Sequence, residues 1–382
     1  MARKITGKKV KKVLIGIVIP LLIGCGVGLL CAVLAMQVLP EDAADSAYFI
    51  NLGLMLVLMA VSMWLHTILH EGGHLIFGLM TGYRFCSFRI GKVMIAMQDG
   101  RLRLSRMHIA GTGGQCLMTP PEMVDGRMPY VLYNLGGVIV NAVVAVIGLA
   151  VFLLTGMQSV WNAFPLMMAV TGFATALLNG IPMSGAVSND GANCAAVAKD
   201  PNALEALRMQ LVINERITAG VRPKDMPEEW FRVPEGADMK NPLIAARGIF
   251  AEARLLDAGC YDEAWTMTKQ LLNGHGGVAG VQRALLTVDA VYLALVVERD
   301  ADKAKKLLDK PTGKIMKAMA MQPSVIRTEY ALALLADHDE KKAQNALERF
   351  EKAAGMHPYT CEIESERELI AYAQRLAECF GE

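Results

Sequence analysis

Ionisable side chains are missing from two long stretches of the N-terminal half of this 382-residue chain. No Asp, Glu, Lys, Arg or His occurs from Met128 to Asn189, and the segment from Val13 to Met36 carries no charge. A helix in a water-soluble protein rarely stays apolar on every face, whereas a membrane-spanning helix needs about 20 mostly apolar residues. The absence of charge therefore excludes a wholly water-soluble protein and predicts a membrane protein.

Four apolar segments are expected to cross the bilayer as helices: Val13–Met36, Tyr48–Met80, Tyr130–Leu154 and Phe164–Leu178. Basic residues precede the first segment and follow the second, while the loop between them contains Glu41, Asp42 and Asp45 and no Lys or Arg. Because cytoplasmic loops are enriched in Lys and Arg, we expect a multi-pass protein of the cell membrane with both termini in the cytoplasm.

The balance of charge and the placement of cysteine exclude two further classes. A formal net charge of +1 gives no reason to expect a nucleic acid as partner. Cys25 and Cys31 lie in the first predicted span and the other cysteines in or near predicted cytoplasmic segments, so a disulfide framework is not expected. The sequence Leu22–Cys25 resembles a lipoprotein cleavage box, but the residues after Cys25 stay apolar, which argues against lipidation.

A short segment between the second and third predicted spans has the character of β structure. The runs Tyr83–Ile90, Val93–Met97 and Leu102–His108 are rich in strand-forming residues, and Asp99-Gly100 is a turn signal between the last two. We predict a small membrane-associated β-hairpin, followed by a flexible glycine segment at Gly111–Gly114 and a loop at Thr119–Pro121. It is expected either to offer an edge strand to an extended peptide or to cap the helices.

The second half of the chain is charged and rich in Ala and Leu, which is typical of soluble helices. Pairs of helical patterns recur at a spacing of roughly 35–40 residues from Asn241 onwards, as in tetratricopeptide-like arrays. The predicted organisation is a basic segment with the first span (1–46), a membrane core (47–195), a linker with one or two short helices (196–240) and a cytoplasmic helical-repeat domain (241–382). The last of these is a candidate docking domain for a cytoplasmic protein.

The sequence His70-Glu71-Gly72-Gly73-His74 lies inside the second predicted span. Its two histidines are four residues apart and therefore share one helical face, where both imidazoles can reach one zinc ion. Glu71 is placed to take a proton from water held there. An ionisable group inside a membrane span is costly and is a functional candidate by default; hydrogen-bonded structural histidines are the plainer alternative.

A catalytic zinc site of this type needs a third protein ligand. Between Arg127 and Lys199 the only Asp, Glu, Lys, Arg or His is Asp190, which makes it the predicted ligand. His66 competes by lying one turn before His70, but three ligands at i, i+4 and i+8 of one straight helix do not converge on a point. We therefore expect His66 to lie near the site without binding the metal.

These motifs together resemble the site-2 protease family of intramembrane metalloproteases. The resemblance rests on His70–His74, on Asn179-Gly180-Ile181-Pro182 and on Asn189-Asp190-Gly191, and it covers roughly residues 48–195. It implies an unwound membrane helix that supplies Asp190, and substrate contacts from four residues that match the family: Gly136, Gly137, Asn141 and Asn179. Interhelical hydrogen bonding is the alternative role for Asn141 and Asn179.

The chain departs from this family in two respects. Seven residues separate Pro182 from Asp190, more than is usual, so a loop must bulge out before the ligand. The peptide-binding or nucleotide-binding domains often fused to the family are not evident, and the helical array takes their place.

The resulting prediction is an all-α membrane protein of about four transmembrane helices with a small β-hairpin and a soluble tetratricopeptide-like domain. It would bind one Zn2+ through His70, His74 and Asp190 and cleave membrane-spanning proteins near the cytoplasmic face, with Glu71 as general base. Two other functions use the same residues: a catalytically silent scaffold acting through its helical domain, and a metal-ion carrier. The carrier would need further ligand sets, and the last two predicted spans contain no ionisable residue.

Overall fold

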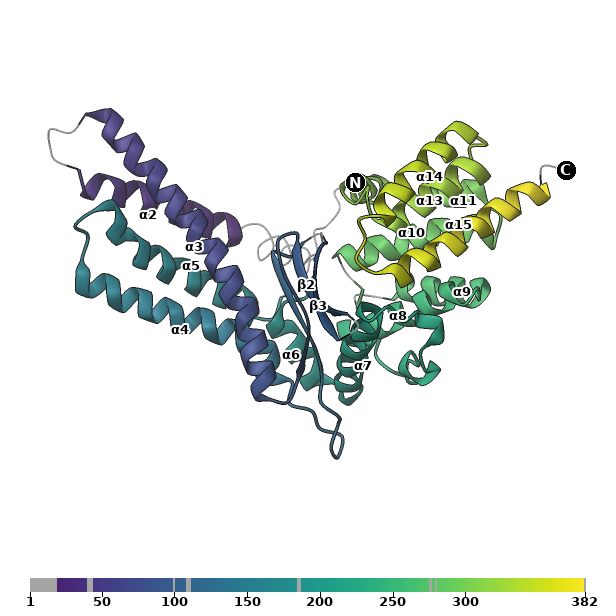
Figure 1. The fold of residues 1–382 in the computed structure, drawn as a ribbon, viewed down its shortest axis with the longest axis horizontal. Helices are drawn as coiled ribbons and strands as arrows, with labels where there is room; N and C mark the ends of the chain where they lie inside the picture. Colours follow the sequence, from purple (N-terminus) through teal and green to yellow (C-terminus); the bar gives the residue numbers. More distant parts are fainter. Residues whose placement is uncertain are drawn as a thin grey trace, which may run out of the picture.

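The computed structural model describes residues 19–39, 44–98, 100–107, 111–183, 187–274, 277–278 and 280–380. Most of these residues are helical, and the exception is a small antiparallel sheet in the middle of the molecule (Figure 1). The apolar helices of the first half lie on one side of this sheet in Figure 1, and the helices of the second half lie on the other.

Three helices are long and apolar enough to cross a membrane: α3 (Asp45–Met80), α4 (Val131–Thr155), and α5 (Ala163–Gly180) together with the short 3-10 turn η2 (Val160–Asn162) before it. They match three of the four predicted spans in position, length and apolar composition. The first predicted span begins outside the described residues. Its described part forms α2 (Ile19–Gln37), and a span at this position remains a prediction.

Large apolar side chains cover the outside of the membrane helices. Trp64 on α3, Val146 on α4 and Leu177 on α5 are each more than half exposed. In water such a surface would be costly at about 25 cal/mol per Å², but in a bilayer it faces lipid. Inside the bundle, α2, α3 and α5 share one apolar core that includes Cys31, Met55 and Met167.

The sheet has four strands in the order β3-β2-β1-β4. Strands β1 (Arg84–Ile90), β2 (Val93–Gln98) and β3 (Arg101–Arg106) correspond to the predicted strand-like runs. Tight turns at Gly91 and Gly100, both with positive φ, connect them. Strand β4 (Gly114–Thr119) was not predicted, because its glycines and the prolines after it indicated a flexible segment and a loop.

The segment predicted as a linker is more ordered than expected. It contains α6 (Asp190–Lys199), α7 (Pro201–Thr218) and two 3-10 turns, η3 (Pro223–Asp225) and η4 (Glu228–Trp230). Helix α7 buries Leu207, Leu211 and Ile213 in the apolar cores that lie against the sheet. It therefore packs as firmly as a domain helix.

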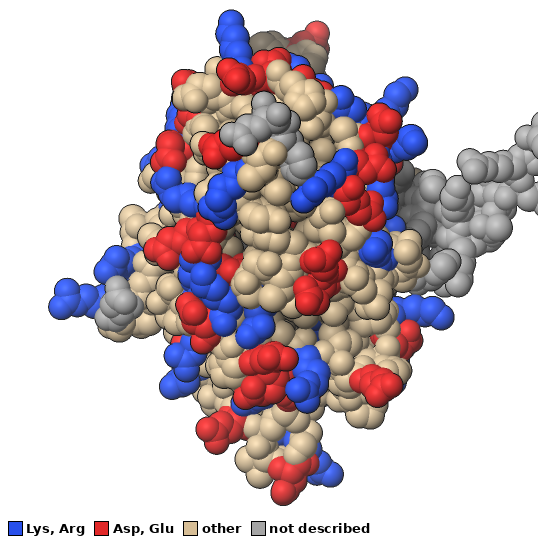
Figure 2. All heavy atoms as spheres, turned by 90° about the vertical axis from the view of Figure 1, so that its right-hand side faces the viewer, with Lys and Arg blue, Asp and Glu red and all other residues tan. Residues whose placement is uncertain are grey.

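The second half of the chain consists of helices that pack in sequence, and their charged side chains of both signs are interspersed over the face seen in Figure 2. The helices are α8 (Pro242–Asp257), α9 (Tyr261–Asn273), α10 (Gly280–Val296), α11 (Ala301–Leu307), α12 (Lys310–Ala318), α13 (Pro323–Leu335), α14 (Glu340–Ala354) and α15 (Thr360–Phe380).

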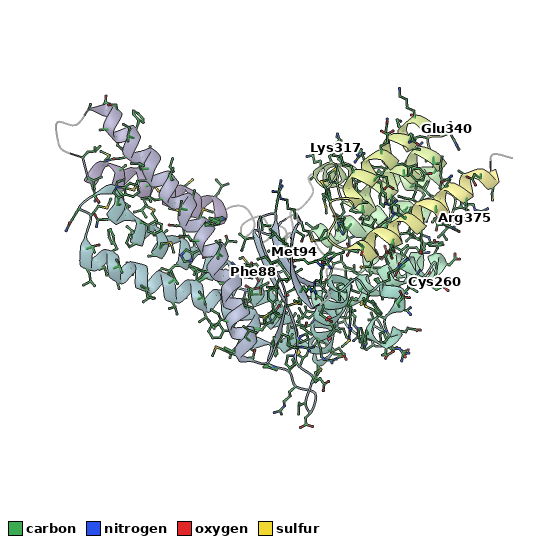
Figure 3. All side chains as sticks on the ribbon, in the orientation of Figure 1. Phe88, Met94, Cys260, Lys317, Glu340 and Arg375 are labelled. Atoms are coloured by element: carbon green, nitrogen blue, oxygen red, sulfur yellow. The ribbon has the colours of Figure 1, made fainter. Side chains whose placement is uncertain are left out.

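This helical half is joined to the sheet through side chains. Met94 lies on the sheet side of this junction in Figure 3, and its sulfur accepts a hydrogen bond from the hydroxyl of Tyr359 at 3.6 Å. The Gln98 amide donates to the carbonyl oxygen of Pro358, and Met94, Ala96 and Tyr359 share one apolar core. The sheet thus connects the membrane helices to the helical half.

Candidate metal centre

Helix α3 presents the three residues of the predicted zinc motif to the interior. Helical spacing places His70 and His74 one turn apart on the same face, and both are buried together with Glu71. The backbone of α3 lies directly against α4 here, because a Cβ atom on Gly73 would lie only 2.4 Å from the carbonyl oxygen of Gly136. This close approach brings the two histidines under the start of α4.

Asp190 reaches the same place from the other side, where the helical structure is interrupted between α5 and α6. The helix ends at Gly180, and Pro182 cannot continue it because its nitrogen carries no hydrogen. The chain returns through a segment of which residues 184–186, in the predicted loop before Asp190, lie outside the described part, and α6 then begins at Asp190.

The side chain of Asn189 bridges the end of α5 and the start of α6 by hydrogen bonds. Its side-chain oxygen accepts hydrogen bonds from the backbone nitrogens of Met183 and Ala192, and its amide donates to the carbonyl oxygens of Leu178 and Ile181. A Cβ atom on Gly191 would lie 2.1 Å from the carbonyl oxygen of Gly180, so only glycine permits this packing. The residues on both sides of Asp190 therefore determine where its carboxylate lies.

Nitrogen and oxygen atoms of His70, His74 and Asp190 converge on one point. The Nε2 atoms of the histidines are 3.3 Å apart, and Oδ2 of Asp190 lies 3.0 Å from the first and 3.5 Å from the second. Oδ2 is buried and, among the described residues, no donor meets it with hydrogen-bond geometry. Two imidazole nitrogens and a carboxylate oxygen that face one another at these distances can each offer an electron pair to a cation, and this buried group can hold a metal ion.

The backbone supports His74 as a ligand. Its Nδ1 lies 2.7 Å from the carbonyl oxygen of Tyr133, which can only accept a hydrogen bond, so Nδ1 carries the proton and Nε2 is left free. Metal-binding histidines generally donate their second ring nitrogen to an acceptor in this way. The contact also links the first turn of α4 to the group of His70, His74 and Asp190, which we call the metal group.

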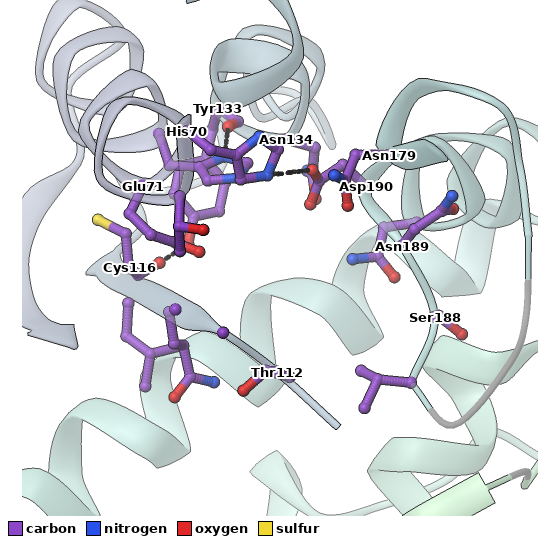
Figure 4. A pocket seen from close by; sticks show the side chains of 18 of the residues that line it. His70, Glu71, Thr112, Cys116, Tyr133, Asn134, Asn179, Ser188, Asn189 and Asp190 are labelled. Atoms are coloured by element: carbon purple, nitrogen blue, oxygen red, sulfur yellow. Dashed lines mark hydrogen bonds and ion pairs between the residues drawn. The ribbon is translucent and has the colours of Figure 1, made fainter. Parts of the chain in front are cut away.

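The metal group opens into a cavity of about 430 Å³. Figure 4 shows Glu71 on one side of this cavity and Asp190 on the other, with His70 between them. The cavity also exposes the side chains of Asn179 and Asn193 and the backbone of the segment before β4. A peptide segment in this cavity would meet the metal ligands and Glu71 together.

Strand β4 forms one wall of the cavity. A Cβ atom on Gly114 would lie 2.6 Å from Oε1 of Glu71, so this strand passes directly over the carboxylate. The sheet order leaves β4 with β1 as its single neighbour, and the strand is therefore an edge strand. The predicted hairpin of β2 and β3 is farther along the sheet, and it is the unpredicted strand that borders the metal group.

A buried arginine fixes the segment that leads into β4. Arg89 on β1 donates hydrogen bonds to the carbonyl oxygens of Gly91 and Gly114 and to the hydroxyl of Thr112. Burial lowers the pKa of this guanidinium, while the negative charge of Glu71 acts in the opposite direction. The segment beside Glu71 is therefore held by a cation from inside the sheet.

Helix α7, which packs against α8 of the helical half, contributes to the cavity. Leu207, Gln210 and Leu211 line it, and the side-chain oxygen of Gln210 is buried with no hydrogen-bond partner among the described residues. Sequence reasoning missed these residues because the segment has the composition of an ordinary amphipathic helix. No local pattern indicates that it faces the metal group.

The remaining predicted site residues take different positions. Asn179 lines the cavity and donates to the carbonyl oxygen of Thr175. Asn141 lies between His66 and His70. Gly136 and Gly137 are buried where α4 meets α3, and a Cβ on Gly137 would lie 2.6 Å from the His70 ring. Contact between these four residues and a substrate stays a prediction.

His66 is outside the group of three ligands, as expected. Its Nε2 atom faces the carbonyl oxygen of Met168 at 2.8 Å, and its Nδ1 atom faces Asn141. Both ring nitrogens thus have partners other than the metal group.

Comparison with protein-family models, with curated proteins and with solved structures finds no match for this chain. Arguments about function therefore depend on the geometry of the site.

Proposed function

We propose that the chain is an intramembrane zinc metalloendopeptidase of the site-2 protease type. The observation that carries this proposal is the convergence of His70, His74 and Asp190 on one point of a cavity that also contains Glu71. Two imidazoles and one carboxylate, with room for a further ligand, are a typical donor set for catalytic zinc. A bound zinc ion supplies Lewis acidity, which polarises a peptide carbonyl and makes water a better nucleophile.

The residues of the chain divide the remaining tasks. Glu71 accepts the proton of the attacking water and passes it to the leaving amine, which is the work of a general base and then of a general acid. Its carboxylate lies between the metal group and Gly114 of β4, in a cavity that is partly open to the outside. A substrate segment can therefore enter the cavity from its open side and approach Glu71.

The edge of β4 is suited to hold an extended substrate. A membrane helix must unwind before its carbonyl groups become accessible, and an unwound segment can add to a sheet edge by main-chain hydrogen bonds. The carbonyl oxygen of Cys116 already accepts a bond from the hydroxyl of Tyr133 at 3.0 Å. The Gly111–Gly114 end of the segment, nearest to Glu71, is thus the part we assign to the substrate.

The membrane setting follows from the three long apolar helices. We place both termini in the cytoplasm and the metal group near the cytoplasmic face, which makes membrane-spanning proteins the substrate class. The hairpin of β2 and β3 fits association with lipid, because its exposed face carries four apolar residues: Val93, Ile95, Leu102 and Leu104. Exposed Arg106, which pairs with Val93 on the same face, favours anionic lipid headgroups.

For the helical half we propose a tetratricopeptide-like array that binds a cytoplasmic protein. Helices of this half begin at Pro242, Gly280 and Pro323, 38 and 43 residues apart, against a predicted repeat of roughly 35–40 residues. Helix α7, which packs against α8 of this half, lines the cavity. A partner bound to the array is therefore in a position to alter access to the site.

The decisive experiment compares the native chain with Glu71→Gln in detergent. The substrate is a single-span model peptide whose helix is interrupted by Gly-Pro and whose end carries a fluorophore. We expect Glu71→Gln to keep one bound zinc ion per chain and to lose about 10²–10⁴-fold in cleavage rate, the usual contribution of general acid–base catalysis. Metal content is measured on the same samples.

Equal cleavage by both proteins would exclude Glu71 as the general base. If the native chain binds zinc but cuts no membrane-spanning peptide, and Glu71→Gln supports the biological output fully, the silent scaffold is the better description.

A further inference from the structure

A chain of hydrogen-bonding groups runs through the bundle behind the metal group. His66 and His70 lie one turn apart on α3, and the side chain of Asn141 from α4 lies between them. The Asn141 amide is 3.0 Å from Nδ1 of His66 and 3.2 Å from Nδ1 of His70. His66 and Asn141 are completely buried.

The positions of the hydrogens in this row of side chains follow from counting hydrogen-bond donors and acceptors. The carbonyl oxygen of Met168, 2.8 Å from Nε2 of His66, can only accept, so Nε2 carries a hydrogen. A neutral imidazole has one N–H, which leaves Nδ1 of His66 as an acceptor. A second proton would place a charge in a wholly buried ring whose hydrogen-bond partners are both uncharged, and this is costly.

Nδ1 of His66 therefore needs a donor, but the structure places the amide oxygen of Asn141 toward it and the NH2 end toward Nδ1 of His70 and the hydroxyl of Thr175. Rotation about the Cβ–Cγ bond exchanges the two ends of an amide at almost no change in shape, and the donor count favours the exchanged orientation. With the NH2 end toward His66, the amide oxygen faces Nδ1 of His70 and the hydroxyl of Thr175, 3.1 Å away. Nδ1 of His70 can donate to it, and the Thr175 hydroxyl can do so in place of its bond to the carbonyl oxygen of Thr171.

The consequence appears at the metal group. Once Nδ1 of His70 donates to the amide oxygen, its Nε2 has no hydrogen and directs its electron pair toward Asp190 and His74. This is the tautomer a metal ligand requires. The opposite amide orientation would force the hydrogen of His70 onto Nε2, between the two atoms that are to share a cation.

Glycines hold both rings in place. A Cβ atom on Gly137 would lie 2.6 Å from the ring of His70, and one on Gly172 would lie 2.6 Å from the ring of His66. Each imidazole thus packs against the backbone of a neighbouring helix and has little freedom to turn away from Asn141.

We infer that Asn141 is a positioning residue that fixes the metal-binding tautomer of His70, and that His66 in turn fixes the orientation of Asn141. The inference rests on the proposed function only in requiring the cation site, and its test needs no catalysis. It gives Asn141 a role toward the metal ligand instead of the substrate contact implied by family resemblance. It also gives His66 a reason to lie one turn from the zinc motif.

The test measures zinc affinity of the full chain in detergent, by competition with a chromophoric chelator. Asn141→Leu, which is close in size but accepts no hydrogen bond, is expected to weaken zinc binding about 10–100-fold, as losing the partner of a ligating histidine typically does. Asn141→Asp keeps an acceptor for His70 and should retain most of the affinity. His66→Leu leaves the amide free to rotate and should give an intermediate loss.

Asn134→Leu is the matched control, because Asn134 is a buried asparagine of the same helix that also borders the cavity, and among the described residues its side chain bonds only to the carbonyl oxygen of Tyr130. Its zinc affinity is expected to equal that of the native chain. The absorption spectrum of bound Co2+ is a second readout, since it reports the ligand set independently of affinity. Here His66→Leu, which removes no ligand, should shift the band positions less than His74→Ala does.

Two outcomes would overturn the inference, and they are distinguishable. If the native chain binds zinc through His74 and Asp190 but Asn141→Leu binds it equally well, the positioning role is wrong and the metal centre stands. If the native chain binds no zinc, or His74→Ala does not weaken binding, the metal centre itself is wrong. A loss with Asn141→Asp as large as with Leu would indicate packing, and would also reject the role.

Discussion

The membrane helices and the helical half of this protein use buried polar groups in different ways. Along α3, α4 and α5 the Asp, Glu, Lys, Arg and His side chains after Asp45 are His66, His70, Glu71 and His74, and all of them line one cavity. The helical half has many charged residues, and several of its buried charges lie in ion pairs away from that cavity. Arg327, for example, is 1% exposed and contacts Asp289 and Glu366.

The difference teaches where a buried charge is informative. In a bilayer an ionisable group without a partner costs several kcal/mol. A cluster of such groups therefore indicates a function, and here the side chains of the cluster converge on one point that can hold a metal ion. In the helical half an ion-pair network satisfies its own members and stabilises the packing of α10, α13 and α15. Burial of charged groups occurs in both halves of the molecule, so burial alone does not identify a functional site. The convergence of three ligand atoms on one point distinguishes the metal group from the ion-pair network.

The largest expected effect sharpens this comparison at the metal group. Asp190→Ala removes one of three ligands and leaves two imidazoles, so zinc bound per chain should fall from one to below the detection limit of metal analysis at micromolar protein. The thermal unfolding of the helical half should not change, because Asp190 contacts none of its buried charges. Retained zinc would show that the carboxylate is not a ligand, and the third ligand would then have to be sought elsewhere.

Arg327→Met is expected to give the next largest effect, at the opposite end of the molecule. The guanidinium also lies 4.5 Å from the ring centre of Tyr292, and its loss leaves buried carboxylates without a counter-charge. Breaking a buried pair by removing one partner typically costs about 3–5 kcal/mol. Chemical denaturation followed by circular dichroism checks this, and zinc binding should be unchanged. A loss below about 1 kcal/mol would mean that the network is not stabilising.

Sequence reasoning recovered the parts of the site that local patterns encode. The i, i+4 spacing indicated His70 and His74, and the scarcity of carboxylates indicated Asp190. It could not recover β4. The Glu71 side chain occupies the space that a Cβ atom on residue 114 would fill, so only glycine fits there. This contact joins segments that are distant in the sequence, and no local pattern reveals it. The same holds for α7, whose periodicity predicts a helix but not which neighbour it covers.

The role of Asn189 was also beyond the sequence. The sequence motif indicates Asp190 as a ligand. The four hydrogen bonds between the Asn189 side chain and the backbone depend on where α5 ends, which the motif does not predict. Residues that act through the tertiary fold leave no period in the sequence. They are found only when the elements are in place.

A smaller effect concerns pH and is again confined to the helical half. Burial raises the pKa of Glu366 from its ordinary value of 4.5 to about 7, although Arg327 acts in the opposite direction. The native state therefore holds this proton more tightly than the unfolded chain. The stability from this group is complete below pH 4.5 and is lost as the pH rises through 7.

We expect the helical half to unfold more easily at pH 8 than at pH 5, by on the order of 2–3 kcal/mol from this group. Burial raises the pKa of Glu252 as well, which adds a change of the same sign. Glu366→Gln should flatten the dependence, as measured by melting temperature against pH. An unchanged slope in this variant would assign the effect to other groups.

The smallest effect is predicted for an arginine that, like Arg327, pairs with a carboxylate and lies over an aromatic ring, but is half exposed. Arg367 on α15 makes two hydrogen bonds to the carboxylate of Glu351 and also lies over an aromatic ring, that of Phe350. Both partners of the ion pair are about half exposed, and exposed pairs contribute roughly 0.2–1 kcal/mol. Arg367→Met should therefore lower the free energy of unfolding by less than 1 kcal/mol, and added salt should reduce the difference further. If Arg367→Met destabilised the chain as much as Arg327→Met, burial would not be what separates the two arginines, and the contrast between the two halves of the molecule would lose its physical basis.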